Sequence, residues 1–214
     1  MNRLRCLALV ALLAASASAQ RNDWLIVPGQ RVGPVTRATT RAELDSLFGR
    51  DNVHDGRFEG GDVPEAATVV MSSDSSAALA ITWEREHPAT IHICFETQSG
   101  PCRWRTASGI RIGLPIRELE KLNGKRFQVS GFNQDRGQVV SWSKGALEED
   151  PALCGHLVVR LSPEAGGELN KGESDLLKQL QSDKPYWSSY MPLLELNTIV
   201  SGLELQFTGE GCGK

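Results

Sequence analysis

The chain has 214 residues and a formal net charge of −3, and 40% of its residues are hydrophobic and 23% charged. A chain of this length can bury the core of one large domain or two small ones. The composition excludes a chain that is disordered throughout, and the slightly acidic charge has the wrong sign for a nucleic-acid-binding surface. We therefore expect a globular protein with no nucleic-acid partner.

The first residues predict export. Residues 1–19 begin with Arg3 and Arg5, continue as an apolar run over 6–15, and end in small residues up to Ala19. This is the pattern of a Sec-type signal peptide cleaved after Ala19. The apolar run is too short to remain as a membrane span, and no second candidate follows it. Cleavage removes two Arg and no acidic residue, so the mature chain has a net charge of −5 and is expected in the periplasm or outside the cell.

Four cysteines remain after cleavage, and an even number in an exported chain predicts disulfide bonds. Four thiols can pair in three ways. We favour Cys94–Cys102 because the Gly-Pro at 100–101 can reverse the chain between them. The remaining pair, Cys154–Cys212, would tie the C-terminal tail to the body. No C-x-x-C motif occurs, so we expect no metal site and no cofactor.

An internal repeat organises the sequence. Residues 24–33 align without gaps on residues 104–113, which lie 80 positions further along the chain. A Trp, an Arg, two Gly and a β-branched residue recur at the same five of the ten positions. Coincidence of rare residue types at fixed spacing predicts two structurally related units.

Each copy of the repeat leads into a predicted short helix. The first lies within 39–49, where a Thr pair can cap the start and Gly49 can end the helix. The second lies within 115–124, where Pro115 suits the first turn and Gly124 follows the end. Helices this short are marginal alone and must be stabilised by packing.

Three strands are predicted after each helix, as an antiparallel meander that the helix covers on one face. This arrangement gives an α+β protein with repeat units over residues 20–100 and 101–165. A C-terminal extension, 166–214, lies outside the repeat and holds a helix near 174–180 and a last strand through Leu203 and Leu205. The meander strands are expected at 68–71, 78–83 and 90–95 in the first unit, and at 127–130, 138–142 and 156–161 in the second.

The duplicated helix-plus-meander pattern resembles the BamE-like and β-lactamase-inhibitor-like group of small envelope modules. Residues 118–135 also resemble a set of uncharacterised secreted bacterial proteins. The first resemblance implies action by binding other proteins rather than by catalysis. The residues that carry it are Gly33, Thr40, Leu44, Leu47 and Gly49, then Gly113, Leu119, Leu122 and Gly124.

Catalytic motifs are missing from the sequence. Neither a G-x-S-x-G nucleophile elbow nor an H-E-x-x-H zinc motif occurs. His92 and His156 fall on comparable third strands, and a shared chemical role would require both on one face beside a carboxylate. The acidic, glycine-rich segment 49–62 could hold calcium on a loop, but a solvated loop without metal is the better interpretation.

Aromatic residues fall into two groups. The four Trp residues placed by the repeat are interpreted as core anchors: Trp24, Trp83, Trp104 and Trp142. A second group follows Pro185 in the extension, and clustered aromatics with Met are typical of recognition surfaces. Packing of the extension onto the body is the alternative. This candidate binding surface consists of Tyr186, Trp187, Tyr190 and Met191.

The sequence thus predicts an exported, non-catalytic binding module for an unidentified protein in the envelope or outside the cell. The competing hypothesis is a secreted or periplasmic hydrolase without a recognisable motif, in which His92 or His156 lies beside a carboxylate in a deep pocket.

Overall fold

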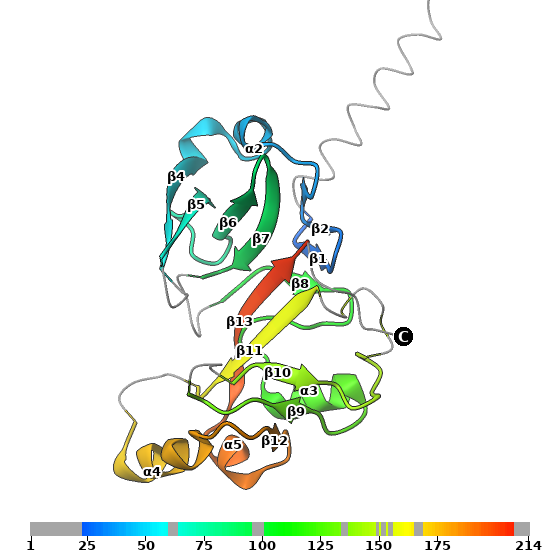
Figure 1. Ribbon diagram of the computed structural model, residues 1–214, viewed down its shortest axis with the longest axis vertical. Coiled ribbons are helices and arrows are strands. Elements are labelled where there is room, and N and C mark those ends of the chain that lie inside the picture. The colour runs from blue at the N-terminus through cyan, green and yellow to red at the C-terminus, as the bar shows by residue number, and fades with distance from the viewer. Residues whose placement is uncertain are drawn as a thin grey trace, which may run out of the picture.

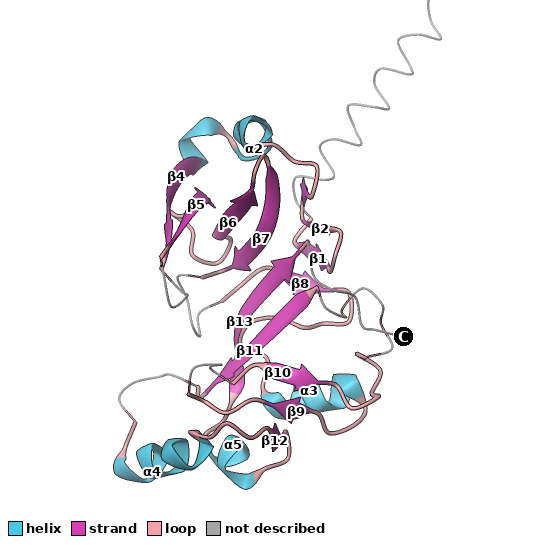
Figure 2. Cartoon of the chain, in the orientation of Figure 1, coloured by secondary structure: helices cyan, strands magenta, loops and turns pink. Residues whose placement is uncertain are grey.

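The computed structural model describes residues 23–59, 64–95, 101–133, 137–148, 150, 153, 156–164 and 169–207. Its helices and antiparallel sheets confirm the α+β class, with sheet strands in the middle of the molecule and helices toward two ends (Figure 2). The predicted signal peptide, 1–19, lies outside the described residues, as do Cys154 and Cys212.

The helices begin and end where local capping allows. Thr40 caps α2 in a capping box with Glu43, and Asn170 caps α4 in the same way with Glu173. Gly124 takes a left-handed conformation, φ 70°, that ends α3 as predicted. The helices are α2 (Arg41–Phe48), α3 (Ile116–Asn123), α4 (Lys171–Leu180) and α5 (Met191–Glu195), with a 3-10 turn η1 (Arg50–Asn52).

One six-stranded antiparallel sheet forms the centre of the molecule, in the order β11-β13-β7-β6-β5-β4 (Figure 1). Side chains alternate between its two faces. On β13, for example, Leu203 and Leu205 are buried, whereas Glu204 between them faces the other side. The strands are β4 (Val53–Phe58), β5 (Glu65–Val70), β6 (Leu79–Glu84), β7 (His87–Ile93), β11 (Leu157–Ser162) and β13 (Ile199–Gln206).

The C-terminal strand β13 lies inside this sheet. It pairs with β7 on one side, where Leu203 is opposite Ile93, and with β11 on the other, where Leu203 is opposite Val159. The sequence predicted this strand but placed it in an extension outside the repeat. In the structure, β13 joins the strands of the first half of the chain to β11.

Segment 49–62, predicted to be a solvated loop, contains a strand. β4 pairs antiparallel with β5 from Val53↔Val70 to Phe58↔Glu65, so four strands rather than three follow α2. Only Val53 on β4 is buried, because β4 is an edge strand with charged, exposed side chains. Its composition therefore resembles that of a loop. No group of three or more metal-ligating side chains occurs among the described residues.

Two smaller sheets complete the fold, in the orders β3-β2-β1-β8 and β10-β9-β12. β1 and β8 pair in parallel, with Leu25 opposite Arg105, so the two aligned segments of the sequence lie side by side. An isolated bridge between Gln138 and Arg160 links the region of β10 to β11. The strands are β1 (Leu25–Val27), β2 (Arg31–Val32), β3 (Val35–Thr36), β8 (Arg105–Thr106), β9 (Gln128–Val129), β10 (Val139–Ser141) and β12 (Tyr186–Trp187).

The core is supported by Trp104 and by a disulfide. Trp104 is 1% exposed, and its indole Nε1 donates a hydrogen bond to the carbonyl oxygen of Ala77 at 3.0 Å. Trp24 packs edge-on against Trp104 with ring centroids 4.8 Å apart. The predicted Cys94–Cys102 disulfide is present and ties β7 to the segment before β8. No described helix has the length and apolar character needed to cross a membrane.

Because β13 lies inside the large sheet, we expect a large loss of stability when one of its buried side chains is shortened. Leu205→Ala should lower the free energy of unfolding by about 2–5 kcal/mol, because Leu205 is fully buried in the core cluster. Val140→Ala, on the 51% exposed side chain of β10, is the control and should change it by less than about 0.5 kcal/mol. Urea denaturation followed by tryptophan fluorescence measures both. Equal effects would contradict the structural importance of β13.

Candidate functional site

Trp187, Tyr190 and Met191 are exposed at one end of the molecule, and Tyr186 beside them is half-buried against the core. These four residues are hereafter called the aromatic surface. Trp187 is 43% exposed, Tyr190 38% and Met191 58%. These three are among four large apolar side chains exposed in the described part of the chain, and the fourth is Val140. The exposure favours a recognition surface over complete packing of the extension onto the body.

Backbone pairing holds the aromatic surface in place. β12 pairs antiparallel with β9, with Tyr186 opposite Val129 and Trp187 opposite Gln128. The next residue, Ser188, is buried; its N–H donates to the carbonyl oxygen of Phe127 at 2.8 Å, and its hydroxyl donates to the Glu120 carboxylate. The segment therefore cannot shift along β9 without losing several hydrogen bonds.

The tyrosines are also fixed. The rings of Tyr186 and Tyr190 stack with centroids 5.0 Å apart and planes 10° from parallel. The Tyr186 hydroxyl donates to the carbonyl oxygen of Gln179 at 2.6 Å, which connects the ring to α4. Rigid aromatic side chains lose little conformational entropy on binding, so this arrangement is suited to contact with a partner.

Cations border the aromatic surface. The guanidinium of Arg126 lies 5.2 Å from the centre of the Trp187 ring, a cation–π contact. A hollow of about 480 Å³ opens nearby between α3 and α5, and Arg117 and Lys125 contribute to its lining. Within the described residues, these three cations have no carboxylate partner, whereas Glu118 is paired with Lys121. The border of the surface is therefore positively charged, although the whole chain is acidic.

His92 lies beside a carboxylate in the centre of the large sheet. Its Nδ1 is 3.4 Å from Glu204 Oε2 on β13, and Arg160 Nη2 on β11 lies 3.3 Å from the same oxygen. Burial alone would raise the pKa of Glu204, but hydrogen bonds from His92 and Gln206 and the charge of Arg160 outweigh it and lower the pKa to about 2.

The hydrolase hypothesis requires a histidine beside a carboxylate in a deep pocket. His92 meets the first condition, but neither His92 nor His156 lines the hollow beside α3 or the one beside α2. The ring of Phe58 stacks on the ring of His92 with centroids 3.6 Å apart and covers it. His156 is engaged elsewhere: its Nδ1 is 3.1 Å from the carbonyl oxygen of Gln206, and its ring packs against Gly29. Glu204 forms an ion pair with Arg160 on β11 and a hydrogen bond with His92 on β7, and these contacts connect β13 to both of its neighbours.

Comparisons of the chain with models of protein families, with curated proteins and with solved structures found no match.

The ion pair predicts a dependence of stability on acid pH. The pKa of Glu204 is lowered from 4.5 to about 2 on folding, so its stabilisation is complete above pH 4.5 and is lost as the pH falls toward 2. The lost stabilisation is on the order of 3 kcal/mol. Glu204→Gln should therefore show a flatter fall of unfolding free energy across this range than the wild type.

The matched control is Glu84→Gln, which removes an exposed carboxylate on β6. Urea denaturation at several pH values between 5 and 2 measures all three proteins. If Glu204→Gln and Glu84→Gln showed the same pH dependence as the wild type, the ion pair would not stabilise the sheet.

Proposed function

We propose that the chain is an exported, non-catalytic binding module that recognises a protein partner through the aromatic surface. The observation that carries the proposal is the exposure of Trp187, Tyr190 and Met191 on a segment whose backbone is held by β9. Aromatic side chains on a rigid support are typical of the residues that dominate binding energy at protein interfaces. A large apolar exposure without a partner would be a liability for solubility.

Export is supported by two features. Residues 1–19 have the composition of a signal peptide, and Cys94 and Cys102 form a disulfide, which persists in oxidising compartments. The periplasm and the extracellular space both meet this condition. The partner is therefore expected among proteins of the envelope or of the medium.

The proposed duplication gives the two ends of the molecule different roles. α2 is followed by β4, β5, β6 and β7, and α3 is followed by β9, β10, β11 and, after the extension, β13. We match the first strand after α2 with the first after α3, the second with the second, and so on. Each unit then has four strands instead of the three expected from the sequence, the additional strands being β4 and β13. In this alignment α4, β12 and α5 are an insertion before the last strand of the second unit. The insertion carries the aromatic surface, so we assign recognition of the protein partner to the second unit and interpret the difference as divergence of two BamE-like modules after duplication.

The charge around the aromatic surface favours an acidic partner. Arg117, Lys125 and Arg126 form no ion pair among the described residues. One carboxylate in the same region, that of Glu120, offsets only part of their charge, so the border keeps a positive excess. Opposite charge on the partner would accelerate association and fix its orientation. A segment that combines an apolar side chain with Asp or Glu fits this surface best.

The first experiment is affinity capture with the oxidised mature protein, residues 20–214. The immobilised protein is exposed to native envelope extract and culture supernatant, and bound species are identified by mass spectrometry. A stoichiometric partner should be retained by the wild type and lost from a variant with Tyr186, Trp187 and Tyr190 changed to Ala. Retention of the same partner by the folded variant would contradict the proposal.

The purified partner then allows a measurement for single residues. Trp187→Ala should weaken binding by about 2 kcal/mol, or roughly 30-fold in Kd, as for other central aromatic contacts. Val140→Ala removes an exposed apolar side chain outside the aromatic surface and is expected to leave Kd unchanged. Isothermal titration calorimetry measures both variants. Equal affinities would place the binding site elsewhere.

The basic border predicts sensitivity to salt. Arg126→Gln should lower the association rate constant at low ionic strength, because it removes a positive charge that attracts the partner. Raising the salt concentration should reduce the difference between this variant and the wild type, because exposed charges are screened. Surface plasmon resonance at two salt concentrations measures the rates. Identical association rates at low salt would exclude electrostatic attraction through Arg126.

A further inference from the structure

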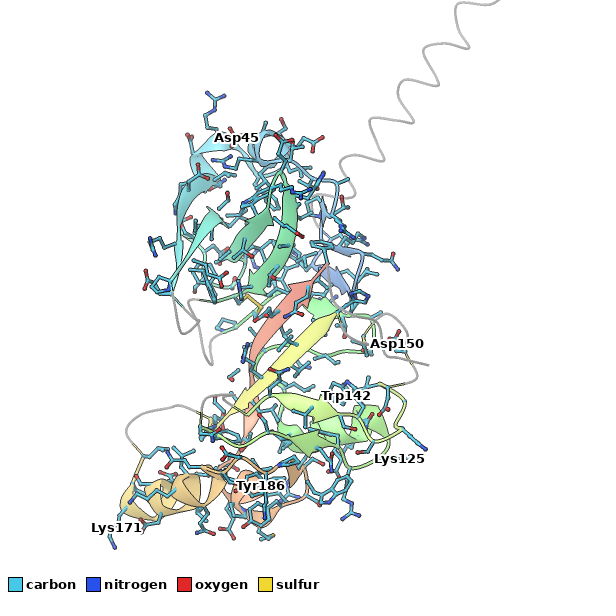
Figure 3. All side chains as sticks on the ribbon, viewed as in Figure 1. Asp45, Lys125, Trp142, Asp150, Lys171 and Tyr186 are labelled. Carbon is cyan, nitrogen blue, oxygen red and sulfur yellow. A yellow bond between two sulfur atoms is a disulfide. The ribbon has the colours of Figure 1, made fainter. Side chains whose placement is uncertain are left out.

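A second hollow, of about 660 Å³, opens on the large sheet beside the N-terminal turn of α2. Its volume falls within the range of small-ligand pockets, roughly 300–1,000 Å³. It lies near the opposite end of the molecule from the aromatic surface, as the positions of Asp45 on α2 and of Tyr186 show (Figure 3). Its lining comes from α2, β4, β5 and the turn between β6 and β7: Thr40, Arg41, Ala42, Asp55, Gly56, Ala66, Ala67, Thr68, Trp83, Arg85 and Glu86.

The hollow exists because a short helix covers only part of the sheet. α2 has eight residues and inserts Leu44 into the core, so the sheet beyond its first turn is left uncovered. The strands carry small side chains in this region: Ala66 on β5 is exposed, and Gly56 lies on neighbouring β4. No large side chain of the lining other than Trp83 is apolar.

A chain of hydrogen bonds fixes the polar wall of the hollow. The Trp83 indole Nε1 donates to Thr68 Oγ1 at 3.0 Å, and Thr68 Oγ1 donates to Asp55 Oδ1 at 3.0 Å. Arg41 Nε donates to the same Asp55 oxygen at 2.8 Å. This hydrogen bond from Arg41 lowers the pKa of Asp55, so the carboxylate is ionised at neutral pH. The indole ring is thereby held at one side of the hollow and the charged pair at another.

The charges of the lining balance. Arg41 and Arg85 supply two cations, and Asp55 and Glu86 supply two anions. A strongly charged ligand would therefore gain little from the site as a whole. An entirely apolar ligand would remove the charged groups of Arg85 and Glu86 from water without supplying hydrogen bonds to them. The lining is best matched by a neutral ligand that has both hydroxyl groups and an apolar face.

We propose that this hollow binds a neutral saccharide. The carbon–hydrogen face of a pyranose ring is apolar and packs against the Trp83 indole and Ala66. Its hydroxyl groups donate to the carboxylates of Asp55 and Glu86 and accept from the guanidinium groups of Arg41 and Arg85, in charge-assisted hydrogen bonds. The site does not depend on the aromatic surface, so the protein carries separate sites for a saccharide and for a protein partner.

The test uses the mature, oxidised protein labelled with nitrogen-15 and titrated with chitotriose, maltotriose and cellotriose at millimolar concentrations. The expected result is a saturable shift of the Trp83 indole N–H signal with at least one of the three saccharides. An aromatic anion, 8-anilinonaphthalene-1-sulfonate, is titrated in parallel. No saturable shift with any saccharide overturns the proposal, and a shift with the aromatic anion alone assigns the hollow to another class of ligand.

Two substitutions on β5 show whether binding is lost because the hollow is filled or because the strand itself is changed. Ala66→Phe fills the hollow with a ring and should weaken saccharide binding about tenfold or more. Glu65→Phe adds the same ring at the neighbouring exposed position, which points to the opposite face of the sheet, and should leave binding unchanged. Equal affinity for the two variants overturns the proposal.

Two further controls keep the test decisive. If Ala66→Phe does not fold, as judged by its amide spectrum, Arg85→Gln replaces it and should also weaken binding, because it removes a charged donor at the rim. The Tyr186, Trp187 and Tyr190 triple variant should bind the saccharide normally. Loss of saccharide binding in that variant would show that the saccharide occupies the aromatic surface, which would overturn this inference without affecting the proposed protein-binding role.

Discussion

The pairing of β13 with both β7 and β11 is the constraint on which the rest of the structure depends. Removing this strand would divide the large sheet into β4-β5-β6-β7 and an isolated β11. The buried side of β13 supplies Leu203 and Leu205 to the common core, and the other side supplies Glu204 to the ion pair with His92 and Arg160. One strand thus joins the two halves through the core on one face and through charged groups on the other.

The position of β13 also determines where the aromatic surface can lie. α4, β12 and α5 occupy the stretch between β11 and β13, and both of these strands are fixed in the sheet. This stretch must leave the sheet at the end of β11 and return to it at the start of β13. It therefore packs beside α3 and β9, where Tyr186 and Trp187 extend the small sheet. The pairing uses the backbone, so the Trp187 ring stays exposed, whereas the Tyr186 ring is half-buried against the core.

Local features were predictable from the sequence, and features that depend on distant residues were not. The caps at Thr40 and Gly49 bound α2 as expected, because capping involves residues only a few positions apart. β4 was missed because Val53 is its one buried residue and the remaining pattern is that of a loop. The aromatic cluster was visible as neighbouring residues, but the cation beside it, Arg126, is brought there only by the pairing of β12 with β9. No sequence pattern predicted the hollow beside α2, because its lining comes from four separated segments and includes small residues such as Ala66.

The order of the chain has a consequence for how the molecule is assembled. β7 ends at Ile93, and one of its two neighbours in the sheet, β13, begins only at Ile199, so this pairing forms after all the other strands of the sheet have been synthesised. Until it emerges, the apolar edge residues of β7 and β11 have no partner, and contacts this distant in sequence form slowly. The large sheet therefore remains incomplete until β13 has been synthesised. In the export that we propose, this late closure would keep the chain in a form that can be translocated.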